Sequence, residues 1–171
     1  MTSAPTAAFL KFPGVRLERL LPGPIERVWE HLTNTRLLPT WFGEKSAIEP
    51  RQGGAVRLMD GHIRGVVTLW QPPHRLSYTW NVFNPNDPPD AVSEYPESYL
   101  TLTLEPQGHD VLLVLTHLPI LERFEKQSAM GWHTFIDILS ATLAGAGPHE
   151  REEYMAQNAA RYGVDLRNLT K

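Results

Sequence analysis

Residues 100–117 read LTLTLEPQGHDVLLVLTH, two apolar runs joined by a short polar turn. In the first run, Leu100, Leu102 and Leu104 alternate with polar residues, which is the two-residue period of a strand with one buried face. The turn PQGHD follows, and a nearly continuous apolar run begins at Val111. Strands joined by so short a connection predict an antiparallel hairpin rather than a parallel pair.

The segments before this hairpin predict one strand, one or two short helices and several more strands. Residues 15–21 have the period of a strand, and residues 25–32 carry one apolar stripe of a helix. A second short helical segment is expected over residues 35–42. Residues 44–82 then alternate between apolar runs and turn signals, and the proline-rich, acidic stretch 84–96 indicates a long loop.

The sequence after the hairpin predicts a long helix over residues 122–144. Its apolar face repeats with the helical period and consists of Trp132, Ile136, Leu139 and Leu143. Two glycines and a proline within residues 145–148 are expected to end it. The element order predicts an α+β fold, in which a curved antiparallel sheet of about six or seven strands packs against this helix.

One glycine inside the long helix needs an explanation, because glycine costs about 1 kcal/mol relative to alanine there. It lies in the stretch AMGWHTF, residues 129–135. We expect Gly131 to let the helix approach the sheet or an adjacent loop closely, at a point where a β-carbon would collide. Trp132 is then expected to point into the core or a cavity, and His133 to lie at the polar border of the helix.

Composition limits the possible functions. The chain has 171 residues, a formal net charge of −3 and no cysteine. No cluster of lysine and arginine is present, which disfavours nucleic-acid binding, and no apolar run is long enough for membrane insertion. The absence of cysteine excludes disulfides and thiolate chemistry. The start of the sequence lacks the layout of a signal peptide, so we expect a cytoplasmic location.

Five segments occur in the order that is typical of one known superfamily. They are residues 21–43 (LPGPIERVWEHLTNTRLLPTWFG), 51–58 (RQGGAVRL), 65–80 (GVVTLWQPPHRLSYTW), 100–117 and 131–143 (GWHTFIDILSATL). This pattern resembles the START-like (SRPBCC) helix-grip superfamily, and specifically its branch with homology to the activator of the Hsp90 ATPase. The resemblance suggests an N-terminal extension (residues 1–14), a helix-grip domain (15–147) and a C-terminal peripheral helix and tail (148–171).

The resemblance implies a cavity between the long helix and the concave sheet. Members of the superfamily bind hydrophobic molecules there, and some cyclise or hydrolyse them. We therefore expect this chain to bind a small hydrophobic or amphipathic ligand, with an enzyme of the cyclase or hydrolase type and a regulatory protein-interaction module as alternatives. The chaperone-activating role belongs to longer proteins, and we do not carry it over.

Aromatic and polar residues at the expected meeting point of the elements are the candidate ligand-binding residues. They are Trp41, Arg64, Trp80, Trp132, His133 and Ile136. The alternative for the aromatic residues is that they simply fill the core.

Two histidines are the candidate catalytic groups, although a structural role is the more common one for such residues. His117 shares a strand face with Val111, but that strand is apolar on both faces, so the sequence does not show which face is inside. His133 and Asp137 are one helical turn apart, a spacing that suits an acid–base pair and equally an ordinary surface contact.

No metal or cofactor is expected. The histidines are scattered and form no ligand motif. The acidic loop 84–96 is expected to be solvated, with a lid over the cavity as the alternative. A homodimer is a further possibility that the sequence leaves open.

Overall fold

A computed structural model describes residues 7–8 and 10–171, and in this part of the chain the strands form one antiparallel sheet of seven. The spatial order is β1-β7-β6-β5-β4-β3-β2. The strands are β1 (Val15–Pro22), β2 (Ala47–Ile48), β3 (Ala55–Leu58), β4 (Ile63–Gln71), β5 (Arg75–Val82), β6 (Ser98–Gln107) and β7 (Asp110–Leu118). The predicted α+β class and its curved antiparallel sheet are confirmed.

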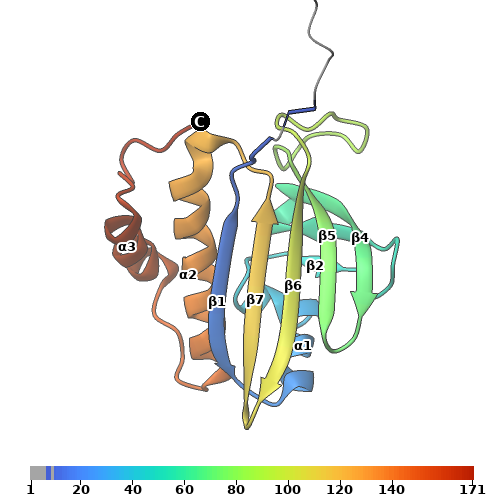
Figure 1. The fold of residues 1–171 in the computed structure, drawn as a ribbon, viewed down its shortest axis with the longest axis vertical. Coiled ribbons are helices and arrows are strands. Elements are labelled where there is room, and N and C mark those ends of the chain that lie inside the picture. Colours follow the sequence, from blue (N-terminus) through green and yellow to red (C-terminus); the bar gives the residue numbers. More distant parts are fainter. Residues whose placement is uncertain (1–6, 9) are drawn as a thin grey trace, which may run out of the picture.

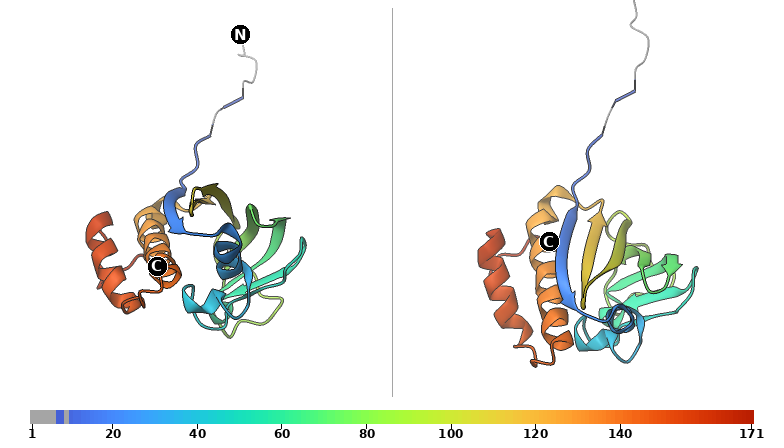
Figure 2. Two further views of the ribbon diagram at one scale, coloured as in Figure 1. Left: turned by 90° about the horizontal axis from the view of Figure 1, so that it is seen from below. Right: turned by 60° about the horizontal axis from the view of Figure 1, so that its bottom comes forward.

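Three α-helices accompany the sheet in the described residues: α1 (Ile25–Thr33), α2 (Glu125–Leu143) and α3 (Arg151–Tyr162). Short 3-10 helices lie at Leu38–Thr40 (η1), Met59–Gly61 (η2) and Glu122–Phe124 (η3). The sheet curves around α1 (Figure 2), while α2 runs along the side of β1 and α3 packs on the outer side of α2 (Figure 1).

The β6–β7 hairpin forms the centre of the sheet, as its alternating sequence predicts. Leu102 pairs with Leu115, and both side chains are buried on the concave face. His117 has the same phase on β7 and is also buried. The structure therefore assigns the inner face of β7, which the sequence left open because both faces are apolar.

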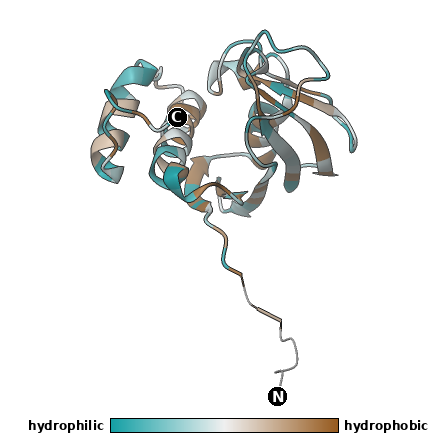
Figure 3. Cartoon of the chain, turned by 90° about the horizontal axis from the view of Figure 1, so that it is seen from above, coloured by the Kyte–Doolittle hydropathy of each residue, from teal (hydrophilic) through white to brown (hydrophobic). Residues whose placement is uncertain are grey.

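The long helix α2 buries the apolar stripe that its sequence predicts. Trp132, Ile136, Leu139 and Leu143 are all at most 4% exposed. The outer helix α3 is mainly hydrophilic, whereas hydrophobic residues concentrate along the strands (Figure 3). α2 thus buries one face in the core and packs its other face against α3.

The explanation expected for Gly131 is wrong. A β-carbon at this position would meet no heavy atom of the described residues within 4 Å, so no close approach requires a glycine. Gly131 instead occupies open space in a regular helix. Gly65 on β4 is the opposite case, since a β-carbon there would collide with the carbonyl of Thr79 on β5.

We expect a Gly131→Ala substitution to stabilise the protein by about 0.5–1 kcal/mol, because it removes the entropic cost of glycine in a helix without a clash. For a chain of this length, Tm should rise by about 1–4 °C in a thermal unfolding experiment. Gly65→Ala is the matched control and should lower Tm. A drop in Tm for Gly131→Ala would show that Gly131 has a packing role after all.

Candidate ligand-binding cavity

A cavity of about 660 Å³ lies at one end of the molecule. It is the upper end in Figure 1, where the loop 84–96, the start of α2 and the segment before β1 come together. Its floor contains Trp80 from β5, Ser98 from β6, His117 from β7 and Met130 from α2. Most other lining residues are apolar and come from the loop, the β7–η3 connection and η3.

A chain of hydrogen bonds crosses the floor of the cavity. The indole Nε1 of Trp132 donates to His117 Nδ1 at 3.0 Å. The other ring nitrogen, His117 Nε2, lies 2.8 Å from Ser98 Oγ, and Ser98 Oγ in turn lies 3.3 Å from the carbonyl oxygen of Trp80. The side chains of Trp132, His117 and Ser98 are at most 5% exposed. We call these hydrogen-bonded groups (the Trp132 indole, the His117 ring, the Ser98 hydroxyl and the Trp80 carbonyl) the floor relay.

The indole group fixes the direction of the floor relay, because an indole nitrogen can only donate. His117 Nδ1 must therefore accept, and in the neutral ring the proton lies on Nε2 and is donated to Ser98 Oγ. A histidine that activates a serine needs the opposite tautomer, with Nε2 free to take the hydroxyl proton. The geometry thus holds His117 in the form that cannot serve as a general base for Ser98.

Burial acts in the same direction as the hydrogen bonds. Desolvation lowers the pKa of His117 from 6.5 to about 4, because the charged ring would be taken out of water. His117 is therefore neutral at physiological pH. The floor relay offers a ligand a polar surface without a formal charge.

Aromatic rings form the wall behind the floor. Trp80 and Trp132 pack against each other with ring centroids 5.2 Å apart. Phe42, which follows η1, is fully buried and contacts both of them, and it also stacks on Phe135 of α2 at 4.7 Å. This cluster fixes the position of the indole that sets the tautomer of His117.

Both ends of the described chain contribute to the cavity entrance. Phe12 and Leu169 are among its lining residues. The side-chain amide of Gln127 on α2 forms two hydrogen bonds with the backbone of Thr170: Nε2 donates to the carbonyl oxygen at 3.2 Å and Oε1 accepts from the amide at 2.6 Å. Residues before β1 and after α3 thereby help to form the cavity.

Of the candidate ligand-binding residues, the structure brings Trp80 to the cavity and places Trp132 directly behind it. Ile136 is fully buried in the core, and Trp41 is buried with its Nε1 donating to the His31 carbonyl at 2.7 Å. Trp132, Ile136 and Trp41 thus lie behind the cavity and are not among the residues that line it.

Arg64 lies away from the cavity and supports the loop 84–96 instead. Its guanidinium donates to the backbone carbonyls of Asp87 at 2.7 Å and Pro88 at 2.9 Å. It also lies over the ring of Phe83, 4.6 Å from the centroid. The far end of the loop reaches the cavity, since Tyr95 lines it and packs edge-on against Phe124.

His133 faces α3, on the side of α2 away from the cavity. Its Nδ1 lies 2.7 Å from the Tyr162 hydroxyl, and its Nε2 lies 3.7 Å from Asp137 Oδ1. Desolvation is the main cause that lowers the pKa of His133, and Asp137 opposes it. His133 and Tyr162 border a second, more polar groove of similar volume between β1, α2 and α3.

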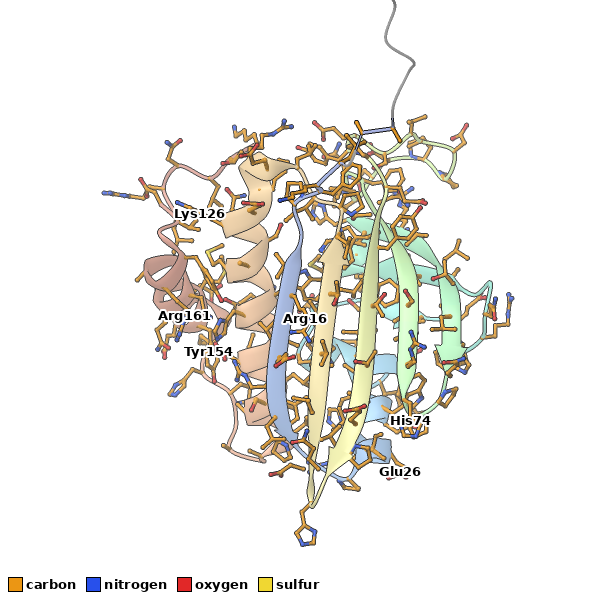
Figure 4. The ribbon with its side chains drawn as sticks, viewed as in Figure 1. Arg16, Glu26, His74, Lys126, Tyr154 and Arg161 are labelled. Atoms are coloured by element: carbon orange, nitrogen blue, oxygen red, sulfur yellow. The ribbon has the colours of Figure 1, made fainter. Side chains whose placement is uncertain are left out.

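Asp137 holds α3 in place rather than forming an isolated pair with His133. Arg19 of β1 donates to its Oδ1 at 2.6 Å, and the fully buried Asn158 of α3 donates to its Oδ2 at 3.0 Å. Arg161, labelled on α3 in Figure 4, donates to Asn158 Oδ1 at 3.3 Å. This polar network joins β1, α2 and α3.

The sequence reasoning missed Ser98 and Phe42. Ser98 is in phase with Leu100 and Leu102, so the alternation of β6 already placed it on the inner face. Phe42 follows Trp41 at the end of a segment with no clear period, and only the packing shows that it, rather than Trp41, contacts the cavity floor.

Neither a metal site nor a membrane-spanning helix is seen in the part of the chain that the structure describes. No group of three or more His, Asp or Glu residues is arranged to hold a metal ion. No helix among the described residues is long and apolar enough to cross a membrane.

Solved structures resemble this chain over most of its length. CalU16 from Micromonospora echinospora is 23% identical, with a TM-score of 0.69 over 88% of this chain and 86% of its own. A Bordetella parapertussis protein is 29% identical, with a TM-score of 0.68 over 96% and 91%. An Hsp90 activator from Plasmodium falciparum is 21% identical, with a TM-score of 0.54 over 64% and 74%.

Sequence comparison gives the family. No curated protein matches the sequence significantly. Residues 22–144, however, match the family described as "Activator of Hsp90 ATPase homolog 1-like protein". The match begins at the last residue of β1 and ends one residue after α2, so it includes strands β2 to β7 and the helix α2. The chain therefore belongs to the Activator of Hsp90 ATPase homolog 1-like family, within the START-like helix-grip fold.

Proposed function

We propose that this protein binds a small hydrophobic or amphipathic molecule in the cavity above the floor relay. The observation that carries the proposal is the cavity itself, whose volume of about 660 Å³ and mainly apolar lining suit such a ligand. Each square ångström of apolar ligand surface buried there contributes about 25 cal/mol to binding. The half-buried Trp80 lies in the floor of the cavity.

The proposal is tested with N-phenylnaphthylamine, a neutral probe whose fluorescence rises in apolar surroundings. We expect saturable binding to the wild type. A Val82→Trp substitution places a large side chain at the cavity wall and should weaken binding by about tenfold or more, since the volume for the probe is lost.

Val66→Trp is the matched control, because Val66 is 46% exposed on the neighbouring strand β4 and is not among the lining residues. It should keep the affinity of the wild type, as should His133→Ala on the α3 side of α2. Equal binding by the Val82 and Val66 variants, or no binding by the wild type, would contradict the proposal.

Regulation of a chaperone ATPase is the second candidate, and the description of the family and that of the Plasmodium relative favour it. Stimulation of an Hsp90 ATPase by the purified protein would support this role. A relative from Colwellia psychrerythraea is described as a dimer, so the mass of this protein in solution should be measured by light scattering in parallel. The Val82→Trp variant separates the two functions, because a purely regulatory role does not need an open cavity.

A further inference from the structure

The polar atoms of the floor relay differ in what they can still offer a ligand. Every hydrogen is committed: Trp132 donates to His117, His117 donates to Ser98, and the Ser98 hydroxyl donates to the carbonyl of Trp80. Ser98 Oγ has two lone pairs and accepts one hydrogen bond among the described residues. One acceptor position on Ser98 Oγ therefore remains at the cavity floor.

A ligand that donates gains more from this floor than a ligand that accepts. A hydroxyl or N–H group adds a hydrogen bond to Ser98 Oγ and leaves the floor relay intact. A carbonyl or ether oxygen has to draw the Ser98 hydroxyl hydrogen away from Trp80, so it exchanges one hydrogen bond for another. The Trp80 carbonyl then loses the Ser98 hydroxyl as a donor. A buried acceptor without a donor costs free energy, so this loss weakens the binding of a ligand that accepts.

The charges around the cavity disfavour an anion. No lysine or arginine is present among the described residues that line it, and the one residue with a formal charge at neutral pH is Glu122. Arg123 lies over the rings of Phe124 and Tyr95, 4.8 and 5.9 Å from their centroids, and is not among the lining residues. Burial keeps His117 neutral. A carboxylate inside the cavity would lack a counter-charge among the lining residues, which is unfavourable.

We infer that the cavity selects an uncharged, mainly apolar ligand bearing a hydroxyl or N–H group, and that this group donates to Ser98 Oγ. The inference rests on the proposed function and adds the chemical class of the ligand to it. Ser98 acts as the acceptor, and Trp132 and His117 position it by holding its hydroxyl hydrogen on the side of Trp80.

Three probes with the same ring system test the inference: naphthol donates a hydrogen bond, methoxynaphthalene only accepts, and naphthoate is an anion. Their affinities are measured by calorimetry on the full chain. We expect naphthol to bind about tenfold more tightly than methoxynaphthalene and naphthoate to bind most weakly. Ser98→Ala should remove the difference between naphthol and methoxynaphthalene. Ser128→Ala, which changes the lining serine on α2, should preserve it.

The possible failures can be told apart. If none of the three probes binds, the proposed function and this inference both fail. If the probes bind but methoxynaphthalene equals naphthol, or naphthoate binds as tightly as naphthol, only the inference is overturned. The wild-type ranking is decisive without any variant, so a Ser98→Ala protein that does not fold leaves the test standing.

Discussion

A Phe42→Ala variant is expected to lose about 3–5 kcal/mol of its free energy of unfolding, the range for truncating a buried phenylalanine. The side chain of Phe42 is fully buried, and its ring contacts Trp41, Trp80, Trp132 and Phe135. These large rings cannot all move into the space that the missing ring leaves. Because single domains are stable by about 5–15 kcal/mol, this one substitution should remove a large part of the total.

Equilibrium unfolding in urea measures the effect, with Leu20→Ala as the control. Leu20 is 50% exposed on β1, so its truncation should change the stability far less. The Phe42 variant should also bind the neutral probe more weakly, because Trp80 and Trp132 lose the ring that supports them. A loss below about 1 kcal/mol would mean that the aromatic cluster can repack, contrary to the tight contacts described above.

The fold was predictable because its main elements have clear periods. The alternation of Leu100, Leu102 and Leu104 and the helical stripe of α2 each identify one buried face, and the order of elements then leaves few arrangements. The phase of β7 could not be read in the same way, since both of its faces are apolar. The register of β7 against β6, in which Leu115 pairs with the buried Leu102, resolves it, whereas the sequence predicts the hairpin but not its buried face.

The candidate site was harder to predict than the fold, because it depends on hydrogen-bond directions and on long-range contacts. The role of His117 depends on the indole of Trp132, 15 residues away in the sequence. Arg64 is on a strand whose neighbours suggest the core, yet it hydrogen-bonds to loop carbonyls more than 20 residues later. Gly131 shows the limit most plainly, since open space beside a helix leaves no mark in the sequence.

The floor relay also bears on whether the protein catalyses a reaction. Ser98 and His117 lie at the distance of a nucleophile and its base, and distance alone would suggest a hydrolase. The donor at Trp132 gives the ring the opposite tautomer, so the same pair is better suited to binding. Trp132, which is two hydrogen bonds away from Ser98, therefore changes the chemistry that the contact between Ser98 and His117 supports.

Acidification is expected to destabilise the protein by about 3 kcal/mol between neutral pH and pH 4, through His117. Burial lowers its pKa from 6.5 to about 4, and each unit of difference is worth about 1.4 kcal/mol. Between these two pH values the unfolded chain binds the proton and the folded protein does not. The free energy of unfolding therefore rises with pH across this window. The contribution of the neutral His117 is fully present above about pH 6.5.

The structure explains why the folded protein resists this proton. A protonated ring carries hydrogens on both nitrogens, so the hydrogen on Nδ1 would face the indole N–H of Trp132, and two donors would oppose each other. Urea unfolding at a series of pH values measures the slope, which should approach one bound proton per molecule near pH 5.

A His117→Gln variant is the control, because its side chain does not titrate. It should be less stable than the wild type at neutral pH and should lose most of the slope, while His133, whose pKa is also lowered, supplies a smaller remainder. An unchanged slope in this variant would assign the acid sensitivity to other groups and would remove the support for a neutral, tautomer-locked His117 beneath the cavity.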